Sequence, residues 1–197
     1  MIITDEKALR VKCTDVLPDE VGAIREALES ELKHSEMLGN PGIGLAAPQI
    51  GIAKNMAIVR IPNNHNYLLD VDLVNCKIAN GYDKKIFESE GCLSYPGRYE
   101  RTLRWQEIHV INNMVGPNSF IVTGLMAVAC QHELDHLSGI LLPDICLPEQ
   151  KIKIVDKVGP NEPCPCGARD SISGKAKKFK KCHMMGDPAT LENVLKG

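Results

Sequence analysis

Apolar residues recur every third or fourth position between residues 18 and 37, with polar residues between them. These apolar positions are Val21, Ile24, Ala27, Leu28 and Leu32. A spacing of three and four places such side chains on one face of a helix. Asp19 and Glu20 stand at the start, where the helix dipole favours acidic side chains. The pattern therefore predicts one amphipathic helix from Pro18 to about Met37.

The middle of the chain has a different pattern, rich in β-branched and aromatic residues. Its runs, separated by Asn, Gly and Pro, are 56–61, 67–75, 77–87, 98–104, 107–112 and 120–123. Such runs predict strands, and Asn80-Gly81 inside the third run is a hairpin signal. The preceding segment, 39–51, is rich in Gly and Pro, so we expect an irregular loop there that can approach a ligand closely.

A helical pattern returns at residues 124–137, with Leu125, Val128, Ala129 and His132 on neighbouring faces. Strands between two helices, without a regular βαβ alternation, favour the α+β class over a doubly wound sheet. After Pro148 the apolar pattern thins and lysines dominate, which predicts the end of the main domain. We therefore divide the chain into a main domain (1–148), a linker (149–160), a segment with Cys and His (161–186) and a tail (187–197).

Composition indicates the class of protein and its compartment. With 44% hydrophobic and 24% charged residues, the chain has the make-up of a soluble globular protein. No run approaches the ~18 apolar residues of a membrane span, and the acidic first residues do not fit a signal peptide. We therefore expect a cytoplasmic protein without membrane insertion.

Charge is distributed unevenly along the chain. Residues 1–150 carry 13 Lys and Arg against 20 Asp and Glu, whereas residues 151–197 carry 10 against 5. A basic segment attached to an acidic body either meets an anionic partner or is only solvated.

The second predicted helix contains the pattern H-E-x-x-H at residues 132–136. A spacing of four puts His132 and His136 on one face, so both can bind the same metal ion, and Glu133 lies near enough to act on a water at that ion. The alternative is a pair of solvent-facing histidines on a polar helix. Because the pattern is common in zinc peptidases, the third ligand has to distinguish the classes.

Candidates for the third ligand lie on both sides of this helix. A metzincin would need a histidine where the chain has Leu142, so that class is excluded. A thermolysin-like site would use a downstream carboxylate, for which Glu149 and Asp156 are the candidates, but neither lies in a convincing helix. Upstream, Cys92 follows a strand-like run and offers a thiol, although a cysteine taken alone is more often a buried apolar residue.

Three segments together resemble a known family. Residues 42–49 read G-I-G-L-A-A-P-Q, residues 90–94 read E-G-C-L-S, and residues 131–136 read Q-H-E-L-D-H. In this order they resemble the three signature motifs of the peptide deformylases. The resemblance implies antiparallel β-sheets packed around a central helix that carries H-E-x-x-H. It also implies that the chain removes the N-terminal formyl group from formylmethionyl nascent peptides by attack of metal-bound hydroxide, releasing formate.

The resemblance further implies that Cys92, His132 and His136 hold one catalytic divalent metal ion and leave a fourth position for water. Glu133 would act as the general base and then protonate the leaving amine. The family typically works with Fe²⁺, while the same ligands accept Zn²⁺, Ni²⁺ or Co²⁺. A zincin peptidase is the rival within the hydrolases, and a metal-binding adaptor without activity is the rival from another class.

The other implied roles concern the substrate. The backbone N–H of Leu93 and the side-chain amide of Gln49 would stabilise the oxyanion, although Gln49 could instead only anchor its loop. Glu90 and Gln131 would orient the ligands. The implied substrate-binding residues are Ile43, Gly44, Gly91, Arg98, Val128 and Ala129. Main-chain groups of the first three would bind an extended peptide as a strand does. Ile43, Val128 and Ala129 could equally belong to the core, and Arg98 could equally be an exposed charge.

The basic end of the chain carries a second candidate metal site. Cys164, Cys166, Cys182 and His183 form a Cys₃His set, which is complete for a closed structural zinc site. The segment resembles the SEC-C motif at the end of the translocation ATPase SecA, with a longer stretch between its second and third ligands. The alternative is a lysine-rich tail whose cysteines bind nothing. The resemblance and the charge predict an interaction module that brings the enzyme to the ribosome or ribosomal RNA.

Overall fold

The computed structural model describes residues 1–62, 68–112 and 118–148, together with Asn161, Lys175 and Lys178. The chain divides into two units, Met1–Pro148 and Glu149–Gly197. All helices and strands named below belong to the first unit. The predicted linker, the segment with Cys and His, and the tail lie outside the described residues apart from those three, so they stay predictions.

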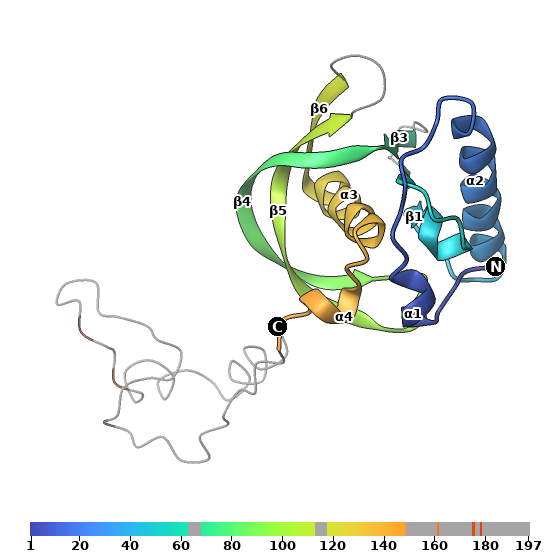
Figure 1. Ribbon diagram of the computed structural model, residues 1–197. Coiled ribbons are helices and arrows are strands. Elements are labelled where there is room, and N and C mark those ends of the chain that lie inside the picture. Colours follow the sequence, from blue (N-terminus) through green and yellow to red (C-terminus); the bar gives the residue numbers. More distant parts are fainter. Residues whose placement is uncertain (63–67, 113–117, 149–160, 162–174, 176–177, 179–197) are drawn as a thin grey trace. The chain divides into compact units, whose positions relative to one another are not determined.

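A central helix, α3 (Gly124–Leu137), lies between two antiparallel sheets (Figure 1). The first sheet consists of β1 (Gly44–Ala46), β2 (Met56–Pro62) and β3 (Leu68–Val74), in that order. The second sheet consists of β4 (Cys76–Gly91), β5 (Tyr99–Asn112) and β6 (Asn118–Thr123), also in sequence order. The predicted α+β fold, with antiparallel sheets around the helix that carries H-E-x-x-H, is confirmed.

The first predicted helix is present as α2 (Val21–Met37) and begins later than the sequence pattern indicates. Residues 17–20 form a turn instead of helix, because the Glu20 carboxylate accepts a hydrogen bond from the Leu17 N–H at 2.8 Å and the Glu20 N–H donates to the Leu17 carbonyl at 3.0 Å. The short helices α1 (Glu6–Leu9) and α4 (Leu142–Ile145) are additions to the predicted elements. With four residues each, they are too short to show a helical period.

The prediction of an irregular loop over residues 39–51 is wrong for its second half. Gly44–Ala46 forms strand β1, which pairs with residues 57–59 of β2, and Ala47–Ile50 forms a short 3-10 helix, η1. Pairing with a distant strand supplies the hydrogen bonds that the local composition does not predict.

The hairpin predicted at Asn80-Gly81 is also wrong. Both residues lie inside the long strand β4, next to a register shift between Ile78 and Asn80. Gly81 is needed there for close packing, since a Cβ at this position would lie 2.6 Å from Cδ1 of Trp105. The predicted runs 98–104 and 107–112 likewise form one continuous strand, β5.

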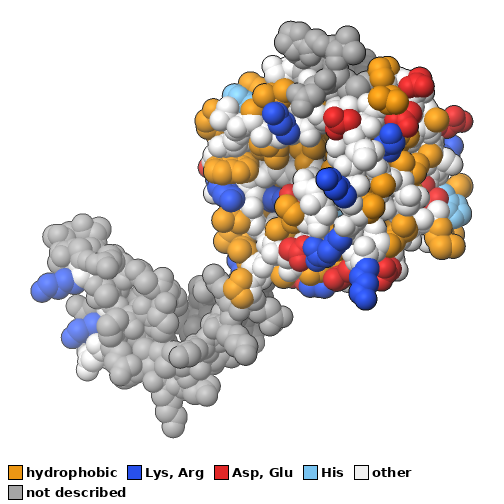
Figure 2. Space-filling model, viewed as in Figure 1, with side chains coloured by type: hydrophobic (Ala, Val, Ile, Leu, Met, Phe, Trp, Pro, Cys, Tyr) orange, Lys and Arg blue, Asp and Glu red, His pale blue; other side chains and the backbone are white. Residues whose placement is uncertain are grey.

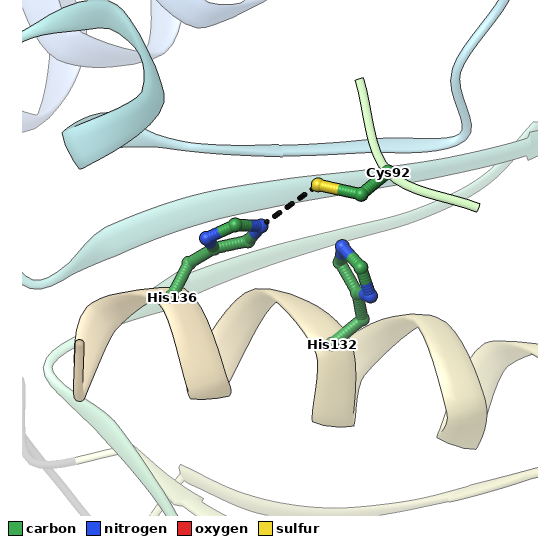
Figure 3. Close-up of side chains that lie close together, drawn as sticks. All are labelled: Cys92, His132 and His136. Atoms are coloured by element: carbon green, nitrogen blue, oxygen red, sulfur yellow. Dashed lines mark hydrogen bonds between the residues drawn. The ribbon is translucent and has the colours of Figure 1, made fainter. Parts of the chain in front are cut away.

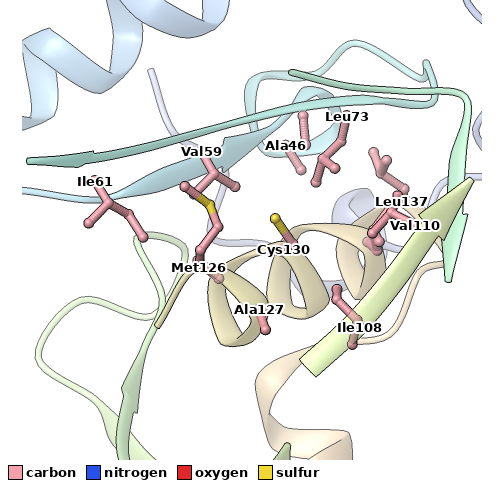
Figure 4. Close-up of a cluster of buried hydrophobic side chains, with 13 residues drawn as sticks. Ala46, Val59, Ile61, Leu73, Ile108, Val110, Met126, Ala127, Cys130 and Leu137 are labelled. Atoms are coloured by element: carbon pink, nitrogen blue, oxygen red, sulfur yellow. The ribbon is translucent and has the colours of Figure 1, made fainter. Parts of the chain in front are cut away.

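Two apolar clusters hold these layers together. In the larger cluster, side chains of α3 pack between the two sheets (Figure 4). In the other cluster, Ile24, Leu28 and Leu32 of α2 pack against the outer face of the first sheet. Apolar residues therefore surround α3 on several sides, and the polar motif residues that it carries are drawn into the interior.

One face of the first unit carries side chains of both charges (Figure 2). Figure 2 shows acidic and basic side chains interspersed over the face that it presents. Within the described residues, no helix is both long and apolar enough to cross a membrane.

Leu28→Ala tests the packing of α2. Leu28 is fully buried, so we expect the substitution to lower the free energy of unfolding by about 2–5 kcal/mol in urea denaturation. Met37→Ala, on the same helix but 71% exposed, is the matched control and should change it by less than about 0.5 kcal/mol. Equal effects of the two substitutions would contradict the assigned core.

Candidate active site

Three side chains that can bind a metal converge beside α3. His132 and His136 lie one turn apart on α3, and Cys92 lies just after β4 (Figure 3). Their potential ligand atoms all lie within 4.8 Å of one another. The Cys92 Sγ is 3.2 Å from Nε2 of His136. The structure thus brings together the three residues that the sequence predicts as ligands.

Cys92 reaches this position because the chain turns directly after β4. The N–H of Tyr95 donates to the Cys92 carbonyl at 2.9 Å, and the N–H of Arg98 donates to the Tyr95 carbonyl at 3.1 Å. Gly97, at φ +75°, takes the left-handed conformation that this reversal requires. The thiol therefore projects from a short, hydrogen-bonded connection between two paired strands.

The Glu90 carboxylate is the buried anchor of the site. It accepts hydrogen bonds from Thr102 Oγ1 at 2.6 Å and from Arg104 Nε and Nη2 at 2.8 and 2.5 Å. His132 Nδ1 lies 2.7 Å from Glu90 Oε1. Burial acts to raise the pKa of Glu90, but the hydrogen bonds from Arg104 and His132 outweigh it and hold the pKa at about 2. Glu90 is therefore a carboxylate at neutral pH.

This carboxylate fixes the orientation of the His132 ring. With Nδ1 held by Glu90, the other ring nitrogen, Nε2, remains for the cluster with Cys92. Burial acts to lower the pKa of His132, whereas hydrogen bonds to Cys92 and Glu90 raise it, to about 10. The surroundings of the ring thus favour a positive charge, and a bound metal cation would supply one.

Arg104 and Gln131 connect the same strand to the helix. Arg104 Nη1 donates to Asp135 on α3 at 2.6 Å. The Gln131 side chain accepts from the Trp105 N–H at 3.0 Å and donates to the Trp105 carbonyl at 2.8 Å and to the Ala127 carbonyl at 2.9 Å. Gln131 therefore attaches α3 to β5, and it positions the helix that carries the histidines.

Glu133 lies against the glycine-rich strand. Its side chain is buried, and Oε2 has no hydrogen-bond partner within the described part of the chain. A Cβ at Gly44 would lie 2.9 Å from the Glu133 Cδ, so only glycine leaves room for this carboxylate. Burial raises the pKa of Glu133 to about 7, with the nearby charge of His132 acting in the opposite direction.

The Gln49 amide is held in one orientation. Its Oε1 accepts from the Ala46 N–H at 2.8 Å, so its Nε2 faces the cysteine, 3.7 Å from Cys92 Sγ and 3.1 Å from Ser94 Oγ. The amide therefore anchors its own turn, as one of the two alternatives holds, and its Nε2 lies beside Cys92, so its role towards an oxyanion stays a prediction.

A cavity of about 240 Å³ opens onto these groups. All six predicted substrate-binding residues line it, as do Gln49, Cys92, Leu93, His132 and Glu133. Arg98 stands at this lining with its guanidinium paired to Glu100 at 2.6 Å. Val128 and Ala129 line this cavity and are also buried in the apolar interior, so their part in substrate binding stays a prediction.

The site also contains residues that the sequence did not predict. Thr102, Arg104, Ser94 and Asp135 complete its hydrogen bonds, and Tyr99 lines the cavity. Ser94 and Asp135 lie inside the three motifs, so the motifs could have indicated them. Thr102 and Arg104 lie outside the motifs, and only the pairing of β4 with β5 shows that they belong to the site.

The donor set fits a divalent metal ion. One thiol and two imidazole nitrogens make a three-ligand arrangement with an open side, as catalytic sites have. Glu133, with an unpartnered buried oxygen among the described residues, borders the same cavity. Fold and geometry together define the class of metal-dependent hydrolases with a single three-ligand centre.

Comparison with known proteins gives the family. The family model for polypeptide deformylase matches residues 1–151. The chain belongs to the peptide deformylase family, metal-dependent hydrolases that remove the N-terminal formyl group from nascent peptides.

Individual relatives agree with this assignment. The peptide deformylase of Natranaerobius thermophilus is 42% identical over 105 residues, which cover 52% of this chain and 65% of that protein, slightly under two thirds of its length. A probable peptide deformylase from Synechococcus phage S-SSM7 superposes with a TM-score of 0.64 at 33% identity, covering 74% of this chain and 98% of that one. The Met-Ala-Ser-bound class I type b enzyme from Acinetobacter baumannii gives 0.61 at 27% identity, covering 74% and 96%.

Arg104→Met tests the buried anchor. Arg104 and Glu90 are 6% and 4% exposed, and removing one partner of such a pair leaves an uncompensated charge. We expect the free energy of unfolding to fall by about 3–5 kcal/mol in chemical denaturation.

Arg101→Met is the matched control, because Arg101 pairs with Glu88 across the same two strands but at 30% and 69% exposure. Its cost should be much smaller than that of Arg104→Met, because solvent screens an exposed ion pair. Similar losses in both variants would contradict the structural role of the buried pair.

Proposed function

We propose that this chain is an active deformylase, which hydrolyses the formamide of formylmethionyl nascent peptides to release formate. The observation that carries the proposal is the convergence of Cys92, His132 and His136 next to the Glu133 carboxylate, in a cavity large enough for a side chain. A related enzyme crystallised with Met-Ala-Ser supports the choice of a peptide substrate that begins with methionine.

In this proposal the three ligands hold one divalent ion, which activates a water molecule and polarises the formyl carbonyl when bound. We infer Fe²⁺ as the native ion, with Zn²⁺, Ni²⁺ or Co²⁺ as ions that the same thiolate and imidazole donors accept. Glu90 keeps the His132 ring in place from behind, as a carboxylate does for many histidine ligands.

Glu133 moves the proton. Its Oε2, which has no hydrogen-bond partner among the described residues, would take a proton from the attacking water and then deliver it to the nitrogen of the leaving amine. The Gln49 Nε2 and the Leu93 N–H would donate hydrogen bonds to the developing oxyanion, and one such donor is typically worth about 3–4 kcal/mol. The fixed orientation of the Gln49 amide supports its part of this role.

The peptide would bind in extended form along the cavity. Main-chain groups of Ile43, Gly44 and Gly91 would pair with it as a neighbouring strand does. The methionine side chain would enter beside Val128 and Ala129 on α3, which line the cavity. Arg98 would lie near the downstream part of the peptide.

Glu133→Gln tests the proton transfer, because it preserves the size of the side chain and removes the proton acceptor. We expect the rate of formate release from formyl-Met-Ala-Ser to fall by a factor of roughly 100 to 10,000. Metal content, measured by elemental analysis, should equal that of the unaltered protein.

Two comparisons make this test specific. Glu88→Gln changes an exposed carboxylate of β4 that pairs with Arg101, and should retain both turnover and metal. Cys92→Ser should lose metal and turnover together, whereas Cys13→Ser, which lies outside the lining of this cavity, should keep both. Turnover of Glu133→Gln at the unaltered rate would refute the assigned role.

We further propose that Cys164, Cys166, Cys182 and His183 bind a structural zinc ion, and that the basic segment around them associates with the ribosome or ribosomal RNA. The sequence supports this proposal through the Cys₃His set and the excess of lysine. We also infer a cytoplasmic location. The five cysteines of the described part form no disulfide bond, which is the usual state in a reducing compartment.

A Cys164→Ser, Cys182→Ser double variant tests the tail. We expect it to bind one zinc equivalent fewer than the full chain, with unchanged formate release. Co-sedimentation with ribosomes at moderate salt should be strong for the full chain and weaker for the variant, since the module that presents its lysines is lost. Equal zinc content, or equal sedimentation, would remove the corresponding part of the proposal.

A further inference from the structure

The outer face of β5 carries an exposed aromatic side chain at the mouth of the cavity. Along β5, Thr102 and Arg104 are buried towards α3, whereas the alternate residues Tyr99 and Leu103 are exposed, at 68% and 43%. Successive side chains of a strand point to opposite faces. Tyr99 therefore stands on the face of the sheet away from α3, yet it also lines the cavity.

The Tyr99 ring covers the last residue of β4. Gly91 and Tyr99 are a cross-strand pair, and a Cβ at Gly91 would lie 2.9 Å from Cε1 and 3.1 Å from Cδ1 of the ring. Glycine at this position thus lets the ring come close to the backbone of β4. The ring is placed next to the strand end that would pair with the peptide under the proposed function.

The alternation of an extended peptide then decides which of its side chains meets this ring. A peptide added to the free edge of β4 at Gly91 places its successive side chains on the two faces of the sheet. With methionine on the α3 face, beside Val128 and Ala129, the next side chain falls on the face of Tyr99.

The surroundings of the ring offer little net charge. Arg98, the cation beside Tyr99, donates to Glu100 at 2.6 Å, and its guanidinium carbon lies 5.7 Å from the centre of the Tyr95 ring. Its charge is therefore already paired. What remains accessible is an aromatic surface, which attracts apolar and above all aromatic side chains.

We propose that Tyr99 is a specificity-determining residue that reads the second residue of the substrate and favours an aromatic or bulky apolar side chain there. This inference rests on the proposed function. One aromatic contact corresponds to a preference of roughly three- to ten-fold. The unaltered enzyme should thus show a higher kcat/KM for formyl-Met-Phe-Ser than for formyl-Met-Gly-Ser.

The test is the ratio of these two kcat/KM values in three variants. In Tyr99→Ala the ratio should fall towards one, through a higher KM for the phenylalanine peptide. Tyr99→Phe, which keeps the ring, should restore it. Tyr82→Ala is the matched control, since Tyr82 is an exposed tyrosine of β4 (47%) that packs on His109 and does not line the cavity. Its ratio should equal that of the unaltered enzyme.

A binding measurement separates this inference from the proposed activity. Calorimetry with Met-Phe-Ser and Met-Gly-Ser should give the same order of affinity, and the same loss in Tyr99→Ala, without any turnover. If Tyr99→Ala lowers both kcat/KM values by one factor and leaves the ratio unchanged, the residue is only structural and the inference is overturned. Absence of formate release by the unaltered protein would refute the activity, while the calorimetric ratio would still decide the role of Tyr99.

Discussion

The structure depends on one buried negative charge, the carboxylate of Glu90. A charge inside a protein is tolerated only when its hydrogen-bonding capacity is met, and here β5 supplies a guanidinium and a hydroxyl while α3 supplies an imidazole. Because the donors come from different elements, the His132 ring is aligned only when the helix packs on the sheet. A chain in which the sheet did not pack on α3 would also lack the metal site. The site therefore forms only in the fully folded protein.

The ligands and Glu133 could be predicted from the sequence because their chemistry restricts both residue type and spacing. Two imidazoles four residues apart on a helix are typical of a metal site, and the cysteine gained meaning from its neighbours in the motif. Arg104 could not be found in this way. Its partner Glu90 is distant in the sequence, and their encounter follows from a strand register that a bulge between Phe87 and Glu90 sets. Long-range pairing of this kind leaves no local pattern.

Two of the errors in the predicted elements have a common cause. The backbone freedom of glycine favours a loop at position 44 and a turn at position 81. In both cases the glycine lies in a strand because another side chain occupies the space of its missing Cβ: the Glu133 carboxylate at one and the Trp105 ring at the other. The sequence shows that a position is glycine. Only the packed structure shows whether glycine is there for backbone flexibility or for the close approach of another side chain.

The attachment of Gln131 to Trp105 has a consequence for how the protein behaves among its copies. Strand β6 pairs with β5 only from residue 107 onward, so the first part of β5 would offer unpaired backbone groups along one edge. At Trp105 the Gln131 amide forms hydrogen bonds with both the backbone N–H and the carbonyl. Nearer the start of β5, the Leu147 N–H donates a hydrogen bond to the Arg101 carbonyl. An exposed strand edge is a template for pairing with other chains. A glutamine on the metal-site helix thus also covers part of a strand edge that would otherwise be open to pairing with another chain.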